Sequence, residues 1–295
     1  MKPRVIAVLT TASLAFTGLV AAASPASAAA APPKITIAVS GDQATVSQTQ
    51  MRPGIVEFTI GKTFTLPGGG DQGGPEQLSV MRTDQLDLVL SQFADVFGDP
   101  SDPAAGAKSA AAMRTIRENS TWYGGGFKGT TYQVRLPAGT YYVLGTQSTP
   151  MGMLKPATFT VSGEPRKGTL HETSGTIAAA STKGGGNKWV ARGLGNLGDG
   201  WLKFTNAAKE IHFLDMSSVK PKTTLDQVTK AFQSQSPPKF FTGESFSFEV
   251  ISPGVRVAIK GPIKAGRYLV DCFVPSEVDG MPHAFMGMVK LVTVG

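Results

Sequence analysis

Short runs in which apolar and polar residues alternate follow one another along most of the chain. The runs are rich in Val, Ile, Thr, Phe and Tyr, and they are separated by Gly, Pro, Asn and Asp; examples are 55–59, 138–143 and 209–215. β-Branched and aromatic runs between turn-forming residues are typical of strands in sandwich proteins. The pattern therefore predicts an all-β sandwich.

Four segments of the first half of the chain recur in the same order in the second half. The pairs are Ile55-Val-Glu-Phe-Thr59 with Trp201-Leu-Lys-Phe-Thr205, Leu86-Asp-x-Val89-x3-Phe93 with Leu225-Asp-x-Val228-x3-Phe232, Ala138-Gly-Thr-Tyr-Tyr-Val143 with Ala265-Gly-Arg-Tyr-Leu-Val270, and Met151-Gly-Met-Leu-Lys155 with Met286-Gly-Met-Val-Lys290. Such recurrence indicates an internal repeat. It predicts two domains, a first copy at residues 34–163 and a second copy at 168–295, joined by a short linker.

Each copy is expected to carry a short inserted helix. In the second copy, Thr224-x-x-Gln227 fits a capping box, and Leu225, Val228 and Phe232 follow at helical spacing until Pro237-Pro238 prevents continuation. The first copy has the corresponding Leu86-to-Phe93 run and a longer Ala-rich insertion at 99–119, which has room for a second helix. These helices are interpreted as structural.

The first 28 residues have the features of a secretory signal. Lys2 and Arg4 precede an apolar run, and Ala26-Ser27-Ala28 provides a small-residue cleavage site. We therefore expect a secreted, extracytoplasmic protein. No later run approaches the ~20 apolar residues of a membrane span, so none is expected.

The charge of the chain adds little to this picture. Removal of residues 1–28 takes away Lys2 and Arg4 and no acidic residue, which lowers the formal net charge from +7 to +5. The basic residues form no run, so nucleic-acid binding has little support.

The chain contains one cysteine, Cys272. Outside the cytoplasm cysteines normally pair, and a single cysteine cannot form an intramolecular disulfide. Metal ligation, an intermolecular bridge and an inert buried thiol are the three explanations. A role as a hydrolytic nucleophile is disfavoured, because Cys272 ends a strand-like run and lies in no known hydrolase signature.

The residues that follow Cys272 favour metal ligation. His283, one of only three histidines, and the methionines Met286 and Met288 lie on the same stretch. A soft thiolate, an imidazole and a thioether form most of a mononuclear copper site, which a second imidazole completes. His212, in the alternating run 209–215, is the candidate for that imidazole.

The order Cys, His and then Met at His-x4-Met, running into a Val-rich strand, resembles the C-terminal copper loop of plastocyanin-like blue copper proteins, the cupredoxin family. One departure is that ten residues separate Cys272 from His283, where small cupredoxins have two to four. The resemblance implies two tandem Greek-key β-sandwich domains, the second with one type 1 copper. It also implies one-electron transfer. The sequence itself shows no paired carboxylates or second metal cluster, so no enzyme is expected.

The resemblance also implies a role for each ligand. Cys272 would supply the covalent thiolate bond, His212 and His283 would complete the plane, and Met288 would be the weak axial ligand. His283 would be the ligand nearest solvent, where a redox partner docks. The apolar residues available to surround it are Phe273, Met281, Phe285 and Met286, for each of which core packing is the plainer alternative.

The first copy lacks a comparable donor set. Leu78 stands opposite His212, Gly145 opposite Cys272 and Ser148 opposite His283, while Met153 matches Met288. The first copy is therefore interpreted as a domain without metal ligands.

Two other functions remain open alongside electron transfer. One is a copper carrier or buffer that uses the same ligands. The other is a metal-free surface or interaction module, which the long gap between Cys272 and His283 favours. The oligomeric state and the redox partner are not indicated by the sequence.

Overall fold

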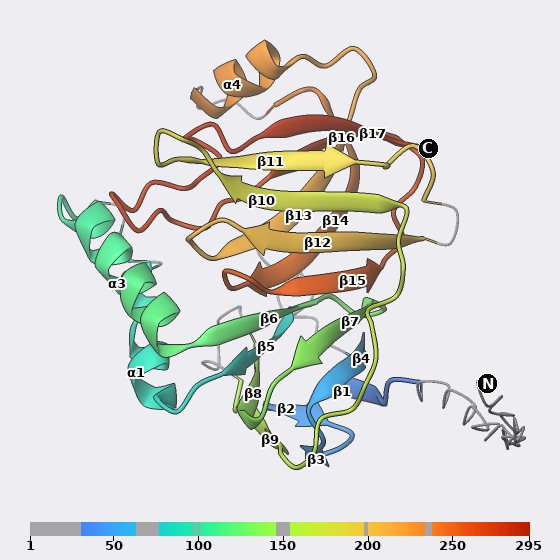
Figure 1. Cartoon of the computed structure of the whole chain (residues 1–295). Coiled ribbons are helices and arrows are strands. Elements are labelled where there is room, and N and C mark those ends of the chain that lie inside the picture. The colour runs from blue at the N-terminus through green and yellow to red at the C-terminus, as the bar shows by residue number, and fades with distance from the viewer. Residues whose placement is uncertain are drawn as a thin grey trace, which may run out of the picture.

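The computed structural model describes residues 31–62, 77–96, 98–99, 101–145, 154–197, 200–233 and 238–295 (Figure 1). The expected signal at 1–28 and the positions Ser148 and Met153 lie outside these residues.

Two mixed β-sheets make up the body of the protein (Figure 1). The eight-stranded sheet has the order β11 (Asn187–Arg192), β10 (Gly175–Ser181), β12 (Trp201–Ala207), β15 (Arg256–Lys260), β7 (Thr131–Leu136), β4 (Gly54–Ile60), β1 (Lys34–Ser40) and β2 (Gln43–Val46). The nine-stranded sheet has the order β17 (Lys290–Val294), β16 (Gly266–Asp271), β13 (His212–Val219), β14 (Phe241–Ile251), β6 (Thr121–Gly126), β5 (Leu78–Arg82), β8 (Gly139–Gly145), β9 (Ala157–Val161) and β3 (Gln50–Met51).

The strands form where apolar residues alternate with polar ones. In β9, for example, buried Ala157, Phe159 and Val161 alternate with two exposed threonines, as expected of a strand with one face on a core. The buried faces of both sheets meet in one hydrophobic cluster that includes residues of both predicted copies. The predicted all-β sandwich is confirmed.

The two sheets continue from one predicted copy into the other. β7 pairs with β15, with Val134 opposite Val257, and β6 pairs with β14. Tyr132 also packs edge-on against Phe248, with ring centroids 5.1 Å apart. Residues 34–163 and 168–295 thus share two sheets and a core, and their division into two domains stays a prediction.

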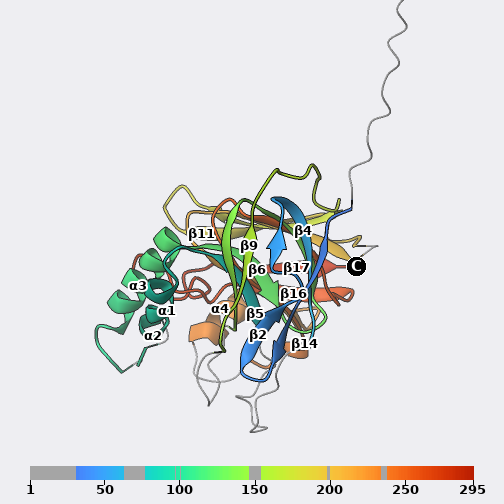
Figure 2. The ribbon, with the colours of Figure 1, turned by 90° about the horizontal axis from the view of Figure 1, so that it is seen from below.

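Helices lie at two places on the sandwich. α1 (Leu86–Ser91), α2 (Phe93–Val96) and α3 (Ala105–Asn119) group at one flank (Figures 1 and 2). α4 (Leu225–Gln233) follows β13 and begins with the predicted capping box, in which the Thr224 amide donates to Gln227 Oε1 at 2.9 Å and the Gln227 amide to Thr224 Oγ1 at 3.3 Å. In the part of the chain that the structure describes, no helix combines the length and apolar character needed to cross a membrane.

Candidate metal centre

Neighbouring strands bring His212 and Cys272 together. His212 is the first residue of β13, and Cys272 directly follows β16. These strands pair with Asp215 opposite Asp271, so the two candidate ligands lie at the same end of the strand pair. His283 belongs to the loop that connects β16 to β17, and Met288 lies just before β17. All four side chains are buried.

The donor atoms of both histidines face the thiol. Cys272 Sγ lies 3.6 Å from His212 Nδ1 and 3.7 Å from His283 Nδ1. The three donor atoms lie within 4.8 Å of one another, and no other group of three or more His, Cys, Asp or Glu residues with this spacing occurs in the described ranges. The structure therefore assembles the three strongest ligands expected from the sequence.

These distances fit a metal ion bound to all three residues. Metal bonds of about 2.3 Å to sulfur and about 2.0 Å to nitrogen, at tetrahedral to trigonal angles, separate the two donors by about 3.5 to 3.7 Å. The observed separations of 3.6 and 3.7 Å match this value. One soft thiolate and two imidazoles suit copper better than a hard cation such as magnesium or calcium.

Burial sets the protonation of the donors. It raises the pKa of the Cys272 thiol to about 12. It also lowers the pKa of His212 well below its ordinary value, with a further contribution from nearby His283. The metal-free protein thus holds a neutral thiol beside a neutral imidazole at neutral pH. A metal ion that binds Cys272 must displace the thiol proton.

Met288 is buried and is fixed through its backbone. Its amide donates to the His283 carbonyl at 2.9 Å, and its carbonyl accepts the Trp189 indole N–H at 3.1 Å. Trp189, on β11, also packs edge-on against His212, with centroids 6.3 Å apart. The position of Trp189 beside two candidate ligands could not be predicted from the sequence, because a Trp in a strand indicates only core packing. The axial role of Met288 stays a prediction.

His283, which the family resemblance implies to be the ligand nearest solvent, is itself covered by protein. It is only 1% exposed, and its Nε2 is hydrogen-bonded to a carboxylate oxygen of Glu210. Glu210 lies two residues before His212, so the turn that delivers one histidine also covers the other. The cover that the β12–β13 connection provides was not predicted, because it leaves no signal in the spacing of the ligands.

The four apolar residues expected around His283 do lie at the surface. Phe273, Met281, Phe285 and Met286 are between 39% and 51% exposed, so the core-packing alternative does not apply to them. The rings of Phe273 and Phe285 pack edge-on with each other and with Phe232 of α4, with centroids 5.6 to 5.7 Å apart. We call Phe232, Phe273 and Phe285 the aromatic patch.

The long segment between Cys272 and His283 is an ordered hairpin. A bridge pairs Pro275 with Pro282, and the Ser276 amide donates to the Met281 carbonyl at 2.9 Å. Gly280 closes the turn with a positive φ of 75°, which favours glycine. The extra residues thus form an element of their own, which we call the ligand-loop hairpin (275–282).

Helix α3 holds the ligand-loop hairpin in place. Arg117 Nε donates to both carboxylate oxygens of Glu277, at 2.7 and 2.8 Å, and Arg114 donates to the Glu277 carbonyl. A Cβ on Gly280 would lie only 2.2 Å from the Gly106 carbonyl oxygen, so the two backbones are in close contact. The first copy, which was interpreted as lacking ligands, thus supports the loop that carries His283.

In the first copy, the positions opposite two ligands are also on neighbouring strands. Leu78 on β5 pairs with Gly145 on β8, as β13 pairs with β16 in the second copy. Leu78 is fully buried in the hydrophobic core. An apolar side chain and a glycine thus occupy the places of His212 and Cys272.

Two acidic residues lie near the site but on the other face of the sheet. Asp215 and Asp271 are directly opposite each other on β13 and β16. Burial and the neighbouring Asp215 raise the pKa of Asp271 to about 8. Neighbouring residues of a strand point to opposite faces, so Asp271 points away from the face of Cys272. We assign this pair no ligand role.

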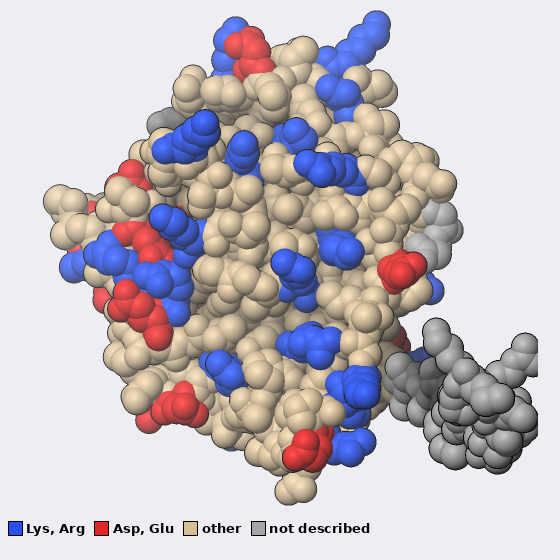
Figure 3. All heavy atoms as spheres, in the orientation of Figure 1, with Lys and Arg blue, Asp and Glu red and all other residues tan. Residues whose placement is uncertain are grey.

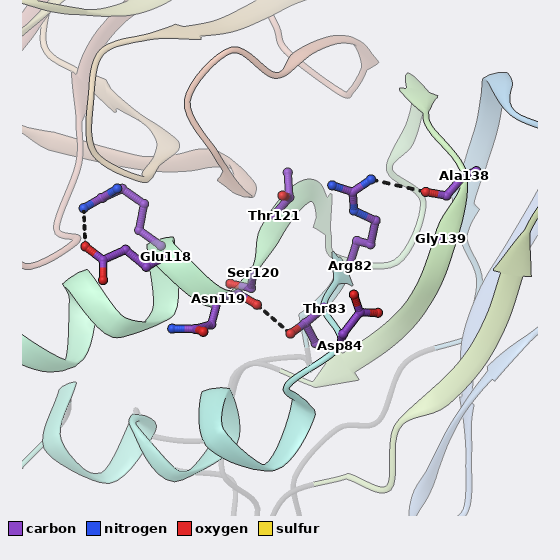
Figure 4. Close-up of a pocket in the computed structure, with 10 residues that line it drawn as sticks. Arg82, Thr83, Asp84, Glu118, Asn119, Ser120, Thr121, Ala138 and Gly139 are labelled. Atoms are coloured by element: carbon purple, nitrogen blue, oxygen red, sulfur yellow. Dashed lines mark hydrogen bonds and ion pairs between the residues drawn. The ribbon is translucent and has the colours of Figure 1, made fainter.

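The remaining polar features of the structure, a surface hollow, the third histidine and the basic side chains, do not involve the candidate ligands. A hollow of about 410 Å³ lies between the end of α3 and strands β5, β6 and β8 (Figure 4), where Arg82 turns toward the Ala138 carbonyl and Thr83 toward that of Asn119. The third histidine, His171, stacks on Trp201 with centroids 4.4 Å apart. On the face seen in Figure 3, basic side chains are spread out rather than gathered over one element.

Comparison with known proteins does not assign the chain to a protein family. No protein-family model matches the chain, and no curated protein matches it. Similar solved structures include auracyanin B, with 20% identity over 32% of this chain and 69% of that chain and a TM-score of 0.20. They also include Fet3p, described as a multicopper oxidase that functions in iron import, with 8% identity over 90% of this chain and 66% of that chain and a TM-score of 0.23. Blue copper oxidase from Nitrosomonas europaea has 11% identity over 88% of this chain and 84% of that chain, with a TM-score of 0.20. Scores this low carry no argument, so the interpretation of the site depends on its own geometry.

The contact of α3 with the ligand-loop hairpin makes a testable prediction. Replacement of Arg117 by Ala leaves Glu277, whose side chain is 10% exposed, without its cation, which costs roughly 1–3 kcal/mol for a buried polar group. We expect faster hydrogen–deuterium exchange at the Met281 and His283 amides. Lys108→Ala, on the same helix but paired with Asp102, is the matched control and should leave this exchange unchanged. Unchanged exchange in Arg117→Ala would show that α3 does not hold the hairpin.

Proposed function

We propose that this protein binds one copper ion through His212, Cys272 and His283, with Met288 as a weak axial ligand, and that it transfers single electrons outside the cytoplasm. The observation that carries the proposal is the convergence of two imidazole Nδ1 atoms on one buried thiol sulfur. The set of two histidines, one cysteine and one methionine is the ligand set of blue copper sites. Export is part of the proposal and depends on the signal expected at 1–28.

The residues of the chain have distinct roles in this function. When bound, copper supplies a one-electron couple. Cys272 gives up its proton to become a thiolate, and burial of the site keeps water from the ligands. Strands β13 and β16 and the ligand-loop hairpin fix the three donors, so that a change of oxidation state requires little movement of the protein.

A redox protein is the proposed partner, and the aromatic patch is its proposed docking surface. Phe273 directly follows Cys272 and is 39% exposed, so it connects the thiolate ligand with the surface. Exposed apolar residues grouped in this way are typical of interaction sites. We propose no catalytic residues.

A copper carrier or buffer is the second candidate function. The observation that favours it is the burial of His283 beneath Glu210, because electron exchange through that imidazole is slower when protein covers it. A measured electron self-exchange rate separates the two functions. A very slow rate supports a carrier, whereas fast exchange supports electron transfer.

The first prediction of the proposal concerns the colour of the site. The mature protein given one equivalent of Cu(II) should show an intense thiolate-to-copper absorption band in the visible. Cys272→Ser should abolish the band because the thiolate is lost. His171→Ala, which removes a histidine outside the site, should keep it. Absence of the band from the unmodified protein, or its persistence in Cys272→Ser, would contradict the proposal and would favour a metal-free interaction module.

The second prediction distinguishes the two methionines. Met288 is buried in the same cluster as Cys272, whereas Met286 is 45% exposed. The axial bond is long and weak, so its loss changes the reduction potential without abolishing binding. We expect Met288→Leu to raise the potential and Met286→Leu, the matched control, to leave it nearly unchanged. The reverse result in cyclic voltammetry would make Met286 the ligand.

A further inference from the structure

The hydrogen bond between His283 and Glu210 joins a candidate ligand to a carboxylate that has no place in the predicted ligand set. Nε2 of His283 contacts Oε2 of Glu210. The side chains are 2% and 14% exposed, respectively, so solvent has little access to the contact. A polar pair at this depth is stabilised by its own hydrogen bond rather than by water.

Two asparagines hold Glu210 against the histidine. Asn187 Nδ2 donates to the same carboxylate oxygen at 3.3 Å. Asn206, which is fully buried, donates to the Glu210 carbonyl at 2.8 Å and to the Ile251 carbonyl at 2.9 Å. Its Oδ1 accepts the Ala208 amide at 3.0 Å. The turn that bears Glu210 is thus fixed at its backbone as well as at its side chain.

This arrangement determines which nitrogen of His283 carries the proton. A carboxylate only accepts hydrogen bonds, so the imidazole donates from Nε2. A neutral imidazole has one N–H, so Nδ1 keeps its lone pair, and Nδ1 is the atom that lies 3.7 Å from the Cys272 sulfur. His212 has no such support, since its buried Nε2 has no hydrogen-bond partner among the described residues.

We propose that Glu210 is a positioning residue, which fixes the tautomer and ring orientation of His283 so that Nδ1 is presented to the metal. The proposal rests on the proposed function, since it names what prepares one ligand of that site. Carboxylates that orient a metal-bound histidine also make the imidazole a stronger donor, and their replacement typically weakens metal binding about 10- to 100-fold. Negative charge beside the ligand favours the more oxidised ion, so Glu210 also lowers the reduction potential.

The test begins with the metal-free mature protein labelled with ¹⁵N-histidine. Two-bond ¹H–¹⁵N correlations report the tautomer of each imidazole. We expect the His283 N–H that faces Glu210 to be on Nε2. In Glu210→Gln, the side-chain amide can donate as well as accept, so the Nδ1–H form should gain population. The Nδ1–H tautomer of His283 in the unmodified protein would overturn the proposal, and this measurement needs neither a variant nor a metal.

Cu(II) affinity and reduction potential provide the second measurement. Glu210→Gln should bind Cu(II) about 10- to 100-fold more weakly and have a higher potential. Glu244→Gln is the matched control, because Glu244 is a half-exposed glutamate paired with Lys264, and it should change neither quantity. Affinity and potential equal to those of the unmodified protein in Glu210→Gln would overturn the proposal. If the unmodified protein binds no copper, the proposed function fails, while the tautomer of His283 still decides whether Glu210 orients it.

Discussion

Three polar metal-donor side chains are buried at one point between the two sheets, and the free-energy cost of that burial constrains the rest of the structure. Burying a thiol and two imidazoles without hydrogen-bond partners raises the free energy of the folded state, and Cys272, His212 and His283 are almost completely buried. They partly satisfy one another, yet Nε2 of His212 has no hydrogen-bond partner in the described part of the chain. Burial keeps the thiol and His212 neutral, so no repulsion between charged donors has to be overcome before a metal ion enters. The three donors therefore converge in a form that the proposed metal ion can bind without first separating like charges.

Such an arrangement requires a rigid frame, and both halves of the chain contribute to it. β13 and β16 fix His212 and Cys272 by sheet pairing, whereas His283 lies on a loop, which would be the weakest support. The ligand-loop hairpin turns that loop into an ordered element, and α3 anchors it through Arg117 and the close approach of Gly106 to Gly280. This gives the first copy a structural role in the site although it contributes no ligand. The long connection between Cys272 and His283 is thus held by a contact from the other half of the chain.

Much of the site could be predicted from the sequence because its signals are local or rare. One cysteine and three histidines leave few combinations, and the alternating run 209–215 indicated that His212 lies on a strand. Thr224 and Gln227 likewise marked the start of α4 by a pattern within four residues. The continuity of the sheets through β6–β14 and β7–β15 was not predicted, because strand periodicity does not say which edge strands pair. Glu210 was missed because one acidic residue among 21 has no local signature, and its role depends on a fold that brings it to His283, 73 residues away.

The central claim is that one metal ion binds where the two Nδ1 atoms and the sulfur converge. Diffraction from crystals of the mature protein soaked in Cu(II), recorded on both sides of the copper absorption edge, tests it most directly. The account predicts one strong anomalous peak within bonding distance of His212 Nδ1, His283 Nδ1 and Cys272 Sγ, with the ligand-loop hairpin in the same place as in the metal-free protein. A peak at His171 alone, or no peak between the three donors at full copper occupancy in solution, would contradict it.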